Sequence, residues 1–318
     1  MENLKQLSNK NKIDLLINEI ETVIIGKRDT IKLTVAAFLA DGHILFEDIP
    51  GVGKTMLVKT FAKAVQAAYT RIQFTPDLLP SDILGVSIFN DQQQQFDFHP
   101  GPIFTDILIA DEINRTTPRS QAALLEAMSE KQLTIDGKTY PLSPNFFVLA
   151  TQNPFDYEGT YPLPEAQLDR FLLNLKIGYP TFEEEKELLT KENRQARLAK
   201  VQPLLEKTEI RALKRAVTEV YVSPVLIDYA LTLVHKTRTH PKIKLGISPR
   251  GSMAFLQVAK ALAVTEGRDY CLPDDFVKLI LPVFGHRLIL ANNYKQQPNA
   301  IEKILADVQA SVPIPVRD

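Results

Sequence analysis

The sequence predicts an α/β fold, in which a core with a parallel sheet is followed by an all-α domain. A glycine loop at residues 51–53 stands between a short apolar run and a segment with helical periodicity. Further short apolar runs are typical of buried parallel strands, and such runs stop near residue 180. With 318 residues, 45% hydrophobic and 24% charged, the chain has the composition of a globular protein with room for two domains.

Helical spacing of apolar residues predicts helices at residues 12–25 and 30–40. Residues 43–47 (HILFE) form a short apolar run bounded by turn residues, which predicts a buried strand. Helical periodicity returns at residues 54–68, directly after the glycine loop. A strand, a glycine loop and a helix in this order begin many α/β nucleotide-binding folds.

The other core strands are predicted at residues 71–74, 107–110, 146–150 and 171–177. A helix is expected at 118–129, and Asp136-Gly137 predicts a hairpin turn within 132–142. Residues 76–102 are rich in Pro, Gly, Asp and Gln, so we expect an inserted loop with at most a small hairpin.

A helix should begin at Thr181, because Glu184 completes a capping box. Serine followed by proline marks two later helix starts, at Ser223-Pro224 and Ser248-Pro249. No strand is expected from residue 181 to the end of the chain. The predicted domains are residues 1–182 (nucleotide-binding core), 183–200 (linking helix) and 201–318 (α-helical domain).

Residues 47–55 read EDIPGVGKT and predict a phosphate-binding loop. Glycine lets backbone N–H groups turn toward an anion, and the following helix N-terminus favours negative charge. Lys54 would contact the β- and γ-phosphates, and the Thr55 hydroxyl would bind Mg²⁺. Asp48 stands where the usual pattern has glycine, so its carboxylate must point away from the phosphates. The expected nucleotide contacts are Asp48, Pro50, Gly51, Val52, Gly53, Lys54, Thr55 and Met56.

Two carboxylates follow the apolar run at 107–110. A phosphate-loop enzyme needs an acidic group at the end of a core strand to orient Mg²⁺, and Asp111 is in this position. Glu112 would be the general base that polarises the attacking water.

Asn153 follows the predicted strand at 146–150 and either orients water or the γ-phosphate or caps a turn before Pro154. Arg170 and Arg250 are either surface residues or cations that stabilise the departing phosphate.

These motifs, in this order, resemble the MoxR family of AAA+ ATPases over nearly the whole chain. The segments that carry the resemblance are 47–55, 73–82, 101–106, 111–115, 150–154, 158–171 and 248–250. The resemblance implies an αβα AAA+ P-loop core with a helical lid, in which residues 76–102 are the helix-2 insert and 131–142 the pre-sensor-1 hairpin. MoxR-like loops often lack glycine at the position of Asp48.

The resemblance also assigns roles to the polar residues outside the loop. It implies that Asn153 is sensor 1, Arg250 sensor 2, and Arg170 an arginine finger acting on the neighbouring subunit of a hexameric ring. Arg115 is similar to a family position near the subunit interface, but the resemblance gives it no definite role. The implied ligands are ATP and Mg²⁺.

Members of this family are thought to remodel, mature or metal-load a protein client, often together with a separate von Willebrand factor A domain protein. A nucleic-acid motor is one alternative, but it needs cations at the tip of the hairpin, where only Lys131 and Lys138 are available. A non-hydrolysing nucleotide switch is another, and the presence of Glu112 argues against it.

The remaining features indicate the compartment. The net charge is −1, so no global field attracts nucleic acid. A single cysteine, Cys271, fits a reducing compartment, and no apolar stretch approaches the roughly 20 residues needed to cross a bilayer. We therefore expect a cytoplasmic protein without membrane insertion.

Overall fold

The computed structural model describes residues 2–49, 51–153, 159–190, 192–294, 297 and 299–315, with side chains from residue 9 onward. Its centre is a five-stranded sheet in the order β2-β5-β8-β1-β9, and every neighbouring pair is parallel. The strands are β1 Ile44–Glu47, β2 Tyr69–Gln73, β5 Ile107–Asp111, β8 Phe147–Gln152 and β9 Leu173–Leu175. The predicted parallel α/β core is confirmed.

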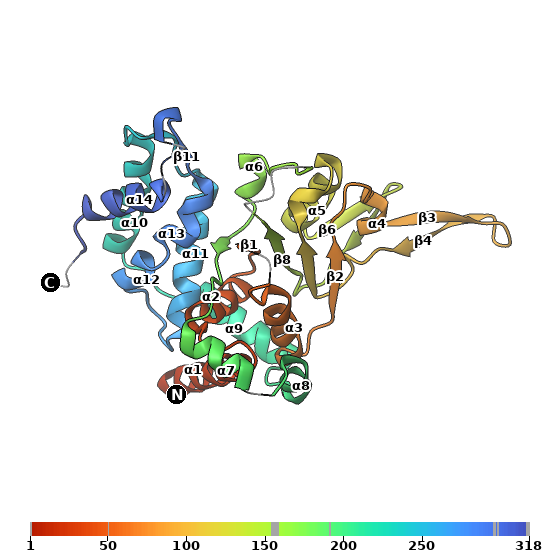
Figure 1. Cartoon of the computed structure of the whole chain (residues 1–318), viewed down its shortest axis with the longest axis horizontal. Coiled ribbons are helices and arrows are strands. Elements are labelled where there is room, and N and C mark those ends of the chain that lie inside the picture. Colours follow the sequence, from red (N-terminus) through yellow and green to blue (C-terminus); the bar gives the residue numbers. More distant parts are fainter. Residues whose placement is uncertain are drawn as a thin grey trace.

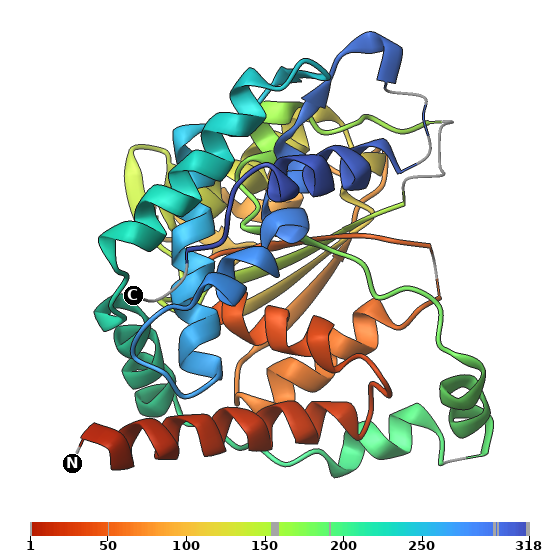
Figure 2. The same cartoon turned by 90° about the vertical axis from the view of Figure 1, so that its left-hand side faces the viewer.

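Alternate residues of each strand point to opposite faces of the sheet and build two separate apolar cores. Phe46 and Leu149 pack into the core on the side of α1 (Glu2–Glu21), α2 (Arg28–Leu39) and α3 (Lys54–Ala64). Leu45 and Val148 pack into the other core, on the side of α4 (Pro80–Leu84) and α5 (Pro118–Glu130). In Figure 2 the red and orange helices α1, α2 and α3 lie below the sheet.

The C-terminal part is mainly helical and shares a core with the N-terminal helices. Its longest helix, α11 (Pro249–Thr265), packs against both α1 and α2, and its apolar side chains belong to the same buried cluster. The helices are α7 Phe182–Thr190, α8 Arg194–Lys200, α9 Lys207–Glu219, α10 Pro224–Thr239, α11 Pro249–Thr265, α12 Pro273–Val277, α13 Ile280–Phe284 and α14 Ala300–Ala310. Most of them gather on one side of the sheet in Figure 1.

Two antiparallel hairpins extend from the core. The predicted turn at Asp136-Gly137 joins β6 (Gln132–Ile135) to β7 (Lys138–Pro141). The inserted segment is more regular than expected, because α4 leads into the paired strands β3 (Gly85–Asn90) and β4 (Gln95–Pro100). This hairpin projects away from the molecule (Figure 1). Phe98 stacks on Tyr140 at 4.3 Å between ring centroids, which joins the bases of the two hairpins.

Short elements complete the fold. They are α6 Glu165–Leu168, the two strands β10 Ile243–Leu245 and β11 Ile289–Leu290, and the 3₁₀ turns Ile113–Arg115, Gly285–Arg287 and Asn292–Tyr294. No helix among the described residues is long and apolar enough to cross a bilayer.

The helix starts predicted from capping residues are confirmed. Thr181 and Glu184 exchange both hydrogen bonds of a capping box at the start of α7. The hydroxyl of Ser223 accepts from the Leu226 amide, and the hydroxyl of Ser248 accepts from the Gly251 amide at 3.0 Å. These local hydrogen bonds satisfy amides that an α-helix leaves unpaired at its N-terminus.

Three expectations were wrong in detail. The helical part does contain a strand pair, β10 with β11, whose strands are too short to show a periodicity. Residues 183–200 are not one helix, because Asn193 accepts a hydrogen bond from the Gln195 amide and starts α8 separately from α7. The strand predicted at 171–177 is shorter, because Phe171 and Ile177 are buried but lie outside β9. An apolar run indicates burial and does not by itself show which residues pair in a sheet.

Candidate nucleotide site

The glycine loop connects β1 to α3 and leaves open space in front of its amides. Gly51 has φ +86° and Gly53 has φ +103°, a backbone conformation that residues other than glycine rarely adopt. A Cβ atom on Gly51 would meet nothing within 4 Å, and one on Gly53 would meet only the Nη1 atom of Arg194 at 3.7 Å. Gly53 is also the N-cap of α3. The loop therefore presents amides and a helix N-terminus to an empty hollow, as an anion-binding site requires.

Asp48 is turned away from this hollow. Its Oδ2 atom accepts hydrogen bonds from the backbone amides of Ile177 and Gly178, at 2.7 and 2.6 Å. Its Oδ1 atom accepts from the Ile49 amide at 2.9 Å. The carboxylate thus fastens the start of the loop to the chain that leaves β9, which gives this non-glycine residue a structural role.

Lys54 begins α3 and lies among oxygen atoms of the site. Its ammonium group donates to the backbone carbonyl of Asp48 at 2.7 Å. Burial lowers the pKa of Lys54, while the negative charges of Asp48, Asp111 and Glu112 act in the opposite direction. These carboxylates favour the charged ammonium, the form that can bind a phosphate.

Asp111 ends β5 and is held by two neighbouring strands. Its Oδ1 atom accepts from the Thr151 hydroxyl of β8 at 2.7 Å. Its Oδ2 atom accepts from Nε and Nη2 of Arg71 on β2, at 2.9 and 2.7 Å. Arg71 therefore supplies a positive charge at the carboxylate that we predict to orient Mg²⁺.

Glu112 directly follows the strand, with a left-handed backbone at φ +58°. Its amide donates to the Thr151 hydroxyl at 2.9 Å. Its Oε2 atom accepts from the Gln73 side-chain amide at 2.8 Å and lies 3.1 Å from Nε of Arg115. Three neighbouring groups therefore fix the position of the predicted general base.

Lys54, Asp111 and Glu112 line one pocket of about 360 Å³ at the carboxyl ends of the strands. Its lining consists of Gly51, Gly53, Lys54, Thr55, Met56, Arg71, Gln73, Asp111, Glu112, Asn153 and Arg194. We call it the phosphate pocket. Predicted residues far apart in the sequence meet here, including Lys54 with Asp111 and Glu112. The predicted contact Pro50 lies outside the described residues.

The phosphate pocket could hold Mg²⁺ only with help from the nucleotide. Thr55 and Asp111 offer a hydroxyl and a carboxylate, the hard oxygen donors that this ion prefers. The described residues contain no group of three or more His, Cys, Asp or Glu side chains able to hold a metal. This donor set fits an ion that takes its remaining ligands from phosphate oxygens and water.

Arg170 and Arg250 are not part of the phosphate-pocket lining. They lie close to a different cluster, in which Asp169 accepts from the Ser248 hydroxyl at 2.8 Å and from Nε of Arg287 at 2.7 Å. Arg250 is exposed and its Nη2 atom contacts the Ser129 hydroxyl at 3.4 Å. The Ser248–Asp169 hydrogen bond joins the two segments that carry the predicted arginines, and neither arginine lines the phosphate pocket of the same chain.

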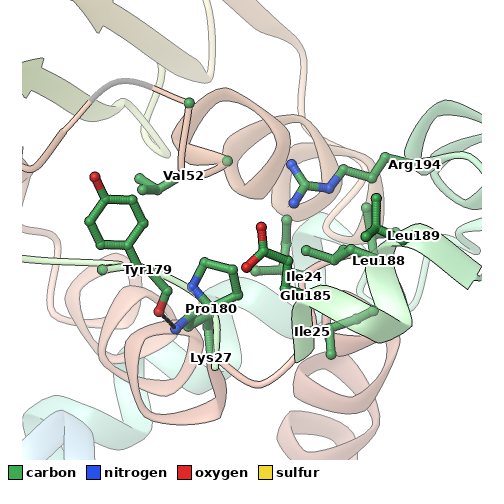
Figure 3. A pocket seen from close by; sticks show the side chains of 14 residues that line it. Ile24, Ile25, Lys27, Val52, Tyr179, Pro180, Glu185, Leu188, Leu189 and Arg194 are labelled. Atoms are coloured by element: carbon green, nitrogen blue, oxygen red, sulfur yellow. Dashed lines mark hydrogen bonds between the residues drawn. The ribbon is translucent and has the colours of Figure 1, made fainter. Parts of the chain in front are cut away.

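A second pocket of about 380 Å³ adjoins the glycine loop and is mostly apolar (Figure 3). We call it the base pocket, because its apolar walls suit a flat heterocycle. Its lining comes from the segment between α1 and α2, the glycine loop, residues 178–180, α7 and the first residue of α8: Val23, Ile24, Ile25, Lys27, Gly51, Val52, Gly53, Gly178, Tyr179, Pro180, Glu185, Leu188, Leu189 and Arg194. Three of the predicted contacts, Gly51, Val52 and Gly53, line this pocket.

Sequence reasoning missed Arg71, Gln73, Arg194 and nearly all of the base pocket. Arg71 and Gln73 could have been found, because they alternate on a predicted strand beside the one ending in Asp111, and alternate residues share a face. The base pocket has no comparable signal, since its apolar side chains look like ordinary core residues.

Comparisons with known proteins show which family this chain resembles. The family model described as "ATPase family associated with various cellular activities (AAA)" matches residues 43–173, and the AAA lid domain matches residues 235–308. The chain is 48% identical to the uncharacterized protein YeaC of Bacillus subtilis, over 95% of this chain and 94% of that one. It is 37% identical to Chaperone MoxR1 of Mycobacterium tuberculosis, over 95% of this chain and 82% of that one.

Structure and sequence lead to the same family. A crystal structure of a protein from Cytophaga hutchinsonii, provisionally named an ATPase, superimposes with a TM-score of 0.89 at 37% identity. The match covers 98% of this chain and 97% of the other. Protein MoxR of Paracoccus denitrificans is 31% identical over 92% of this chain and 93% of its own length. The chain therefore belongs to the MoxR family of AAA+ ATPases.

Proposed function

We propose that this protein hydrolyses ATP with Mg²⁺, and that a ring of subunits uses the hydrolysis to remodel a protein client. The observation that carries the proposal is the meeting of Lys54, Asp111 and Glu112 in front of the open glycine loop. An anion site next to two carboxylates fits a phosphate ester with its metal, and the adjoining apolar pocket fits a base.

In this mechanism, the loop amides and Lys54 bind the β- and γ-phosphates. Thr55 and Asp111 would hold Mg²⁺, which would supply charge neutralisation on the phosphate oxygens. Glu112 accepts a proton from the attacking water, and Asn153 orients the water or the γ-phosphate. Gln73 and Arg115 hold the Glu112 carboxylate and would thereby orient it toward the water.

The placement of Arg170 and Arg250 supports a shared site. Neither lines the phosphate pocket of its own chain, so each would have to reach the nucleotide of a neighbouring subunit. Asp169, Ser248 and Arg287 hold the two segments together, which would present both arginines on one surface. We propose a ring, hexameric as in the family resemblance, in which this surface faces the next phosphate pocket.

The client is proposed to be a protein, because the relative MoxR1 is named a chaperone. A separate von Willebrand factor A domain protein and metal loading of the client belong to the same proposal. The nucleic-acid alternative is weakened by the hairpin, since Lys131 is 3.7 Å from Asp41 and therefore partly neutralised. The switch alternative requires that ATP is bound but not hydrolysed.

Phosphate release by mixed subunits tests the shared site. We expect Lys54→Ala and Arg170→Ala each to be inactive at concentrations where the wild type assembles. Mixing the two should restore part of the activity, because some interfaces then join an intact loop to an intact arginine. An Arg170→Ala variant with unchanged turnover per assembled subunit would contradict the ring mechanism, and a wild type that binds ATP without releasing phosphate would favour the switch.

A further inference from the structure

Arg194 lies where the two pockets meet. It is the first residue of α8, and together with Gly51 and Gly53 it lines both the base pocket and the phosphate pocket. In Figure 3 its guanidinium group points into the hollow beside the glycine loop. If a nucleotide places its base in one pocket and its phosphates in the other, the part of the molecule between them lies beside Arg194.

The guanidinium group lies beside the N-terminus of α3, and the pockets that it lines also contain the carboxylates of Asp111, Glu112 and Glu185. Its Nη1 atom is 3.7 Å from the Cβ position built on Gly53, close to the N-terminus of α3 and the Lys54 residue that follows. A helix N-terminus carries a partial positive charge, so a cation at this point is unfavourable unless an anion joins it. Among the described residues, no side chain or carbonyl forms a hydrogen bond or ion pair with Arg194.

The backbone around Arg194 is nevertheless fixed. Asn193 caps α8 through the Gln195 amide at 2.9 Å. Arg197 donates to the Thr22 carbonyl at 3.0 Å, and Lys63 of α3 donates to the Leu198 and Ala199 carbonyls at 3.0 and 2.6 Å. These bonds attach α8 to the elements that flank the loop, so the cation is held next to the anion site before any ligand arrives.

We propose that Arg194 binds the α- or β-phosphate of the nucleotide in its own subunit. The inference rests on the proposed nucleotide function and adds a residue outside the sheet to the phosphate contacts. A guanidinium group suits this position because its planar N–H groups can donate two hydrogen bonds to one phosphate. Arg194 thereby provides a cation within the subunit, where Arg250 does not line the pocket.

Calorimetric titration of the full chain with ADP, AMP and adenosine tests the assignment. For Arg194→Gln we expect ADP affinity to fall roughly 10- to 50-fold, as for the loss of a charge-assisted hydrogen bond. A parallel loss for AMP places the contact at the α-phosphate, and an unchanged AMP affinity places it at the β-phosphate; either result supports the proposal. Arg194→Lys should retain part of the affinity, because it keeps the charge and loses the planar donor pair.

The matched control is Arg211→Gln, which removes an exposed arginine of α9 outside both pockets and should bind like the wild type. ADP affinity within twofold of wild type in folded Arg194→Gln would overturn the inference, and so would an equal loss of adenosine binding, which places the guanidinium group on the base. Failure of the proposed function looks different: the wild type would bind none of the nucleotides, or Lys54→Ala would bind ADP as well as the wild type.

Discussion

The phosphate pocket and the base pocket share the glycine loop but are built on different physical requirements. The phosphate pocket gathers charged and polar side chains at the ends of parallel strands, where Asp111, Glu112 and Asn153 meet Lys54. The base pocket gathers apolar side chains from the segment between α1 and α2, from the glycine loop, from residues 178–180 and from α7. Chemistry on a phosphate requires particular groups at particular points, whereas a base requires mainly a flat apolar space. Mutations in the phosphate pocket should therefore change turnover or the binding of phosphorylated ligands. Mutations in the base pocket should change only the affinity for the nucleotide.

The largest expected effect is on the chemical step and comes from Glu112→Gln. The amide keeps the shape of the side chain but cannot accept the proton of the attacking water, so phosphate release should fall at least about 100-fold. ATP affinity, measured by calorimetry, should stay within a few fold of wild type, because the base does not hold the nucleotide. Turnover reduced less than about tenfold would show that another group is the base.

Next in size is the loss of phosphate binding in Lys54→Ala. Removal of a charge-assisted hydrogen bond should weaken ATP and ADP binding roughly 10- to 100-fold. Adenosine binding should be unchanged, because Lys54 does not line the base pocket. Equal losses for adenosine and ATP would mean that the variant disturbs the loop as a whole, and the separation between the pockets would not hold.

The same contrast explains what the sequence could predict. The loop at 51–55 and the acidic pair at 111–112 are recognisable because their chemistry needs fixed residue types beside a strand and a helix. The two faces of the sheet also follow from the apolar runs, since side chains alternate along a strand. The phosphate pocket and the parallel core were therefore accessible from one sequence.

The base pocket was not accessible, for physical reasons. Leu188 and Val52 are separated by more than a hundred residues and have no distinguishing chemistry, so only the fold shows that they share a wall. The position of Arg250 depends on how the helical part packs, and the Asp169 cluster that fixes it is a tertiary contact. Local propensity also could not reveal β10 and β11, whose pairing is decided by tertiary contacts.

A smaller effect, confined to affinity, is expected for Leu188→Ser in the base pocket. The loss of apolar contact area should weaken ATP, ADP and adenosine alike by about three- to tenfold. Turnover at saturating ATP should remain at the wild-type level, because no group that acts on the phosphate has changed. Leu231→Ser on α10 is the matched control, since Leu231 is also partly exposed, at 43%, but lies outside the base pocket. A fall in saturated turnover would connect α7 to the chemical step and break the comparison.

The smallest predicted effect tests the electrostatics inside the phosphate pocket. Arg71 occupies one oxygen of Asp111, so it competes with Mg²⁺ for the carboxylate. The side chain of Arg71 is 48% exposed, and partly exposed ion pairs contribute up to about 1 kcal/mol. Arg71→Met should therefore lower the free Mg²⁺ concentration needed for half-maximal phosphate release by about two- to fivefold. Arg119→Met, which removes an exposed arginine at the start of α5, should leave the Mg²⁺ requirement unchanged. A higher requirement in Arg71→Met would instead show that the guanidinium group turns to the bound phosphates, making Arg71 a nucleotide ligand and not a competitor of the metal.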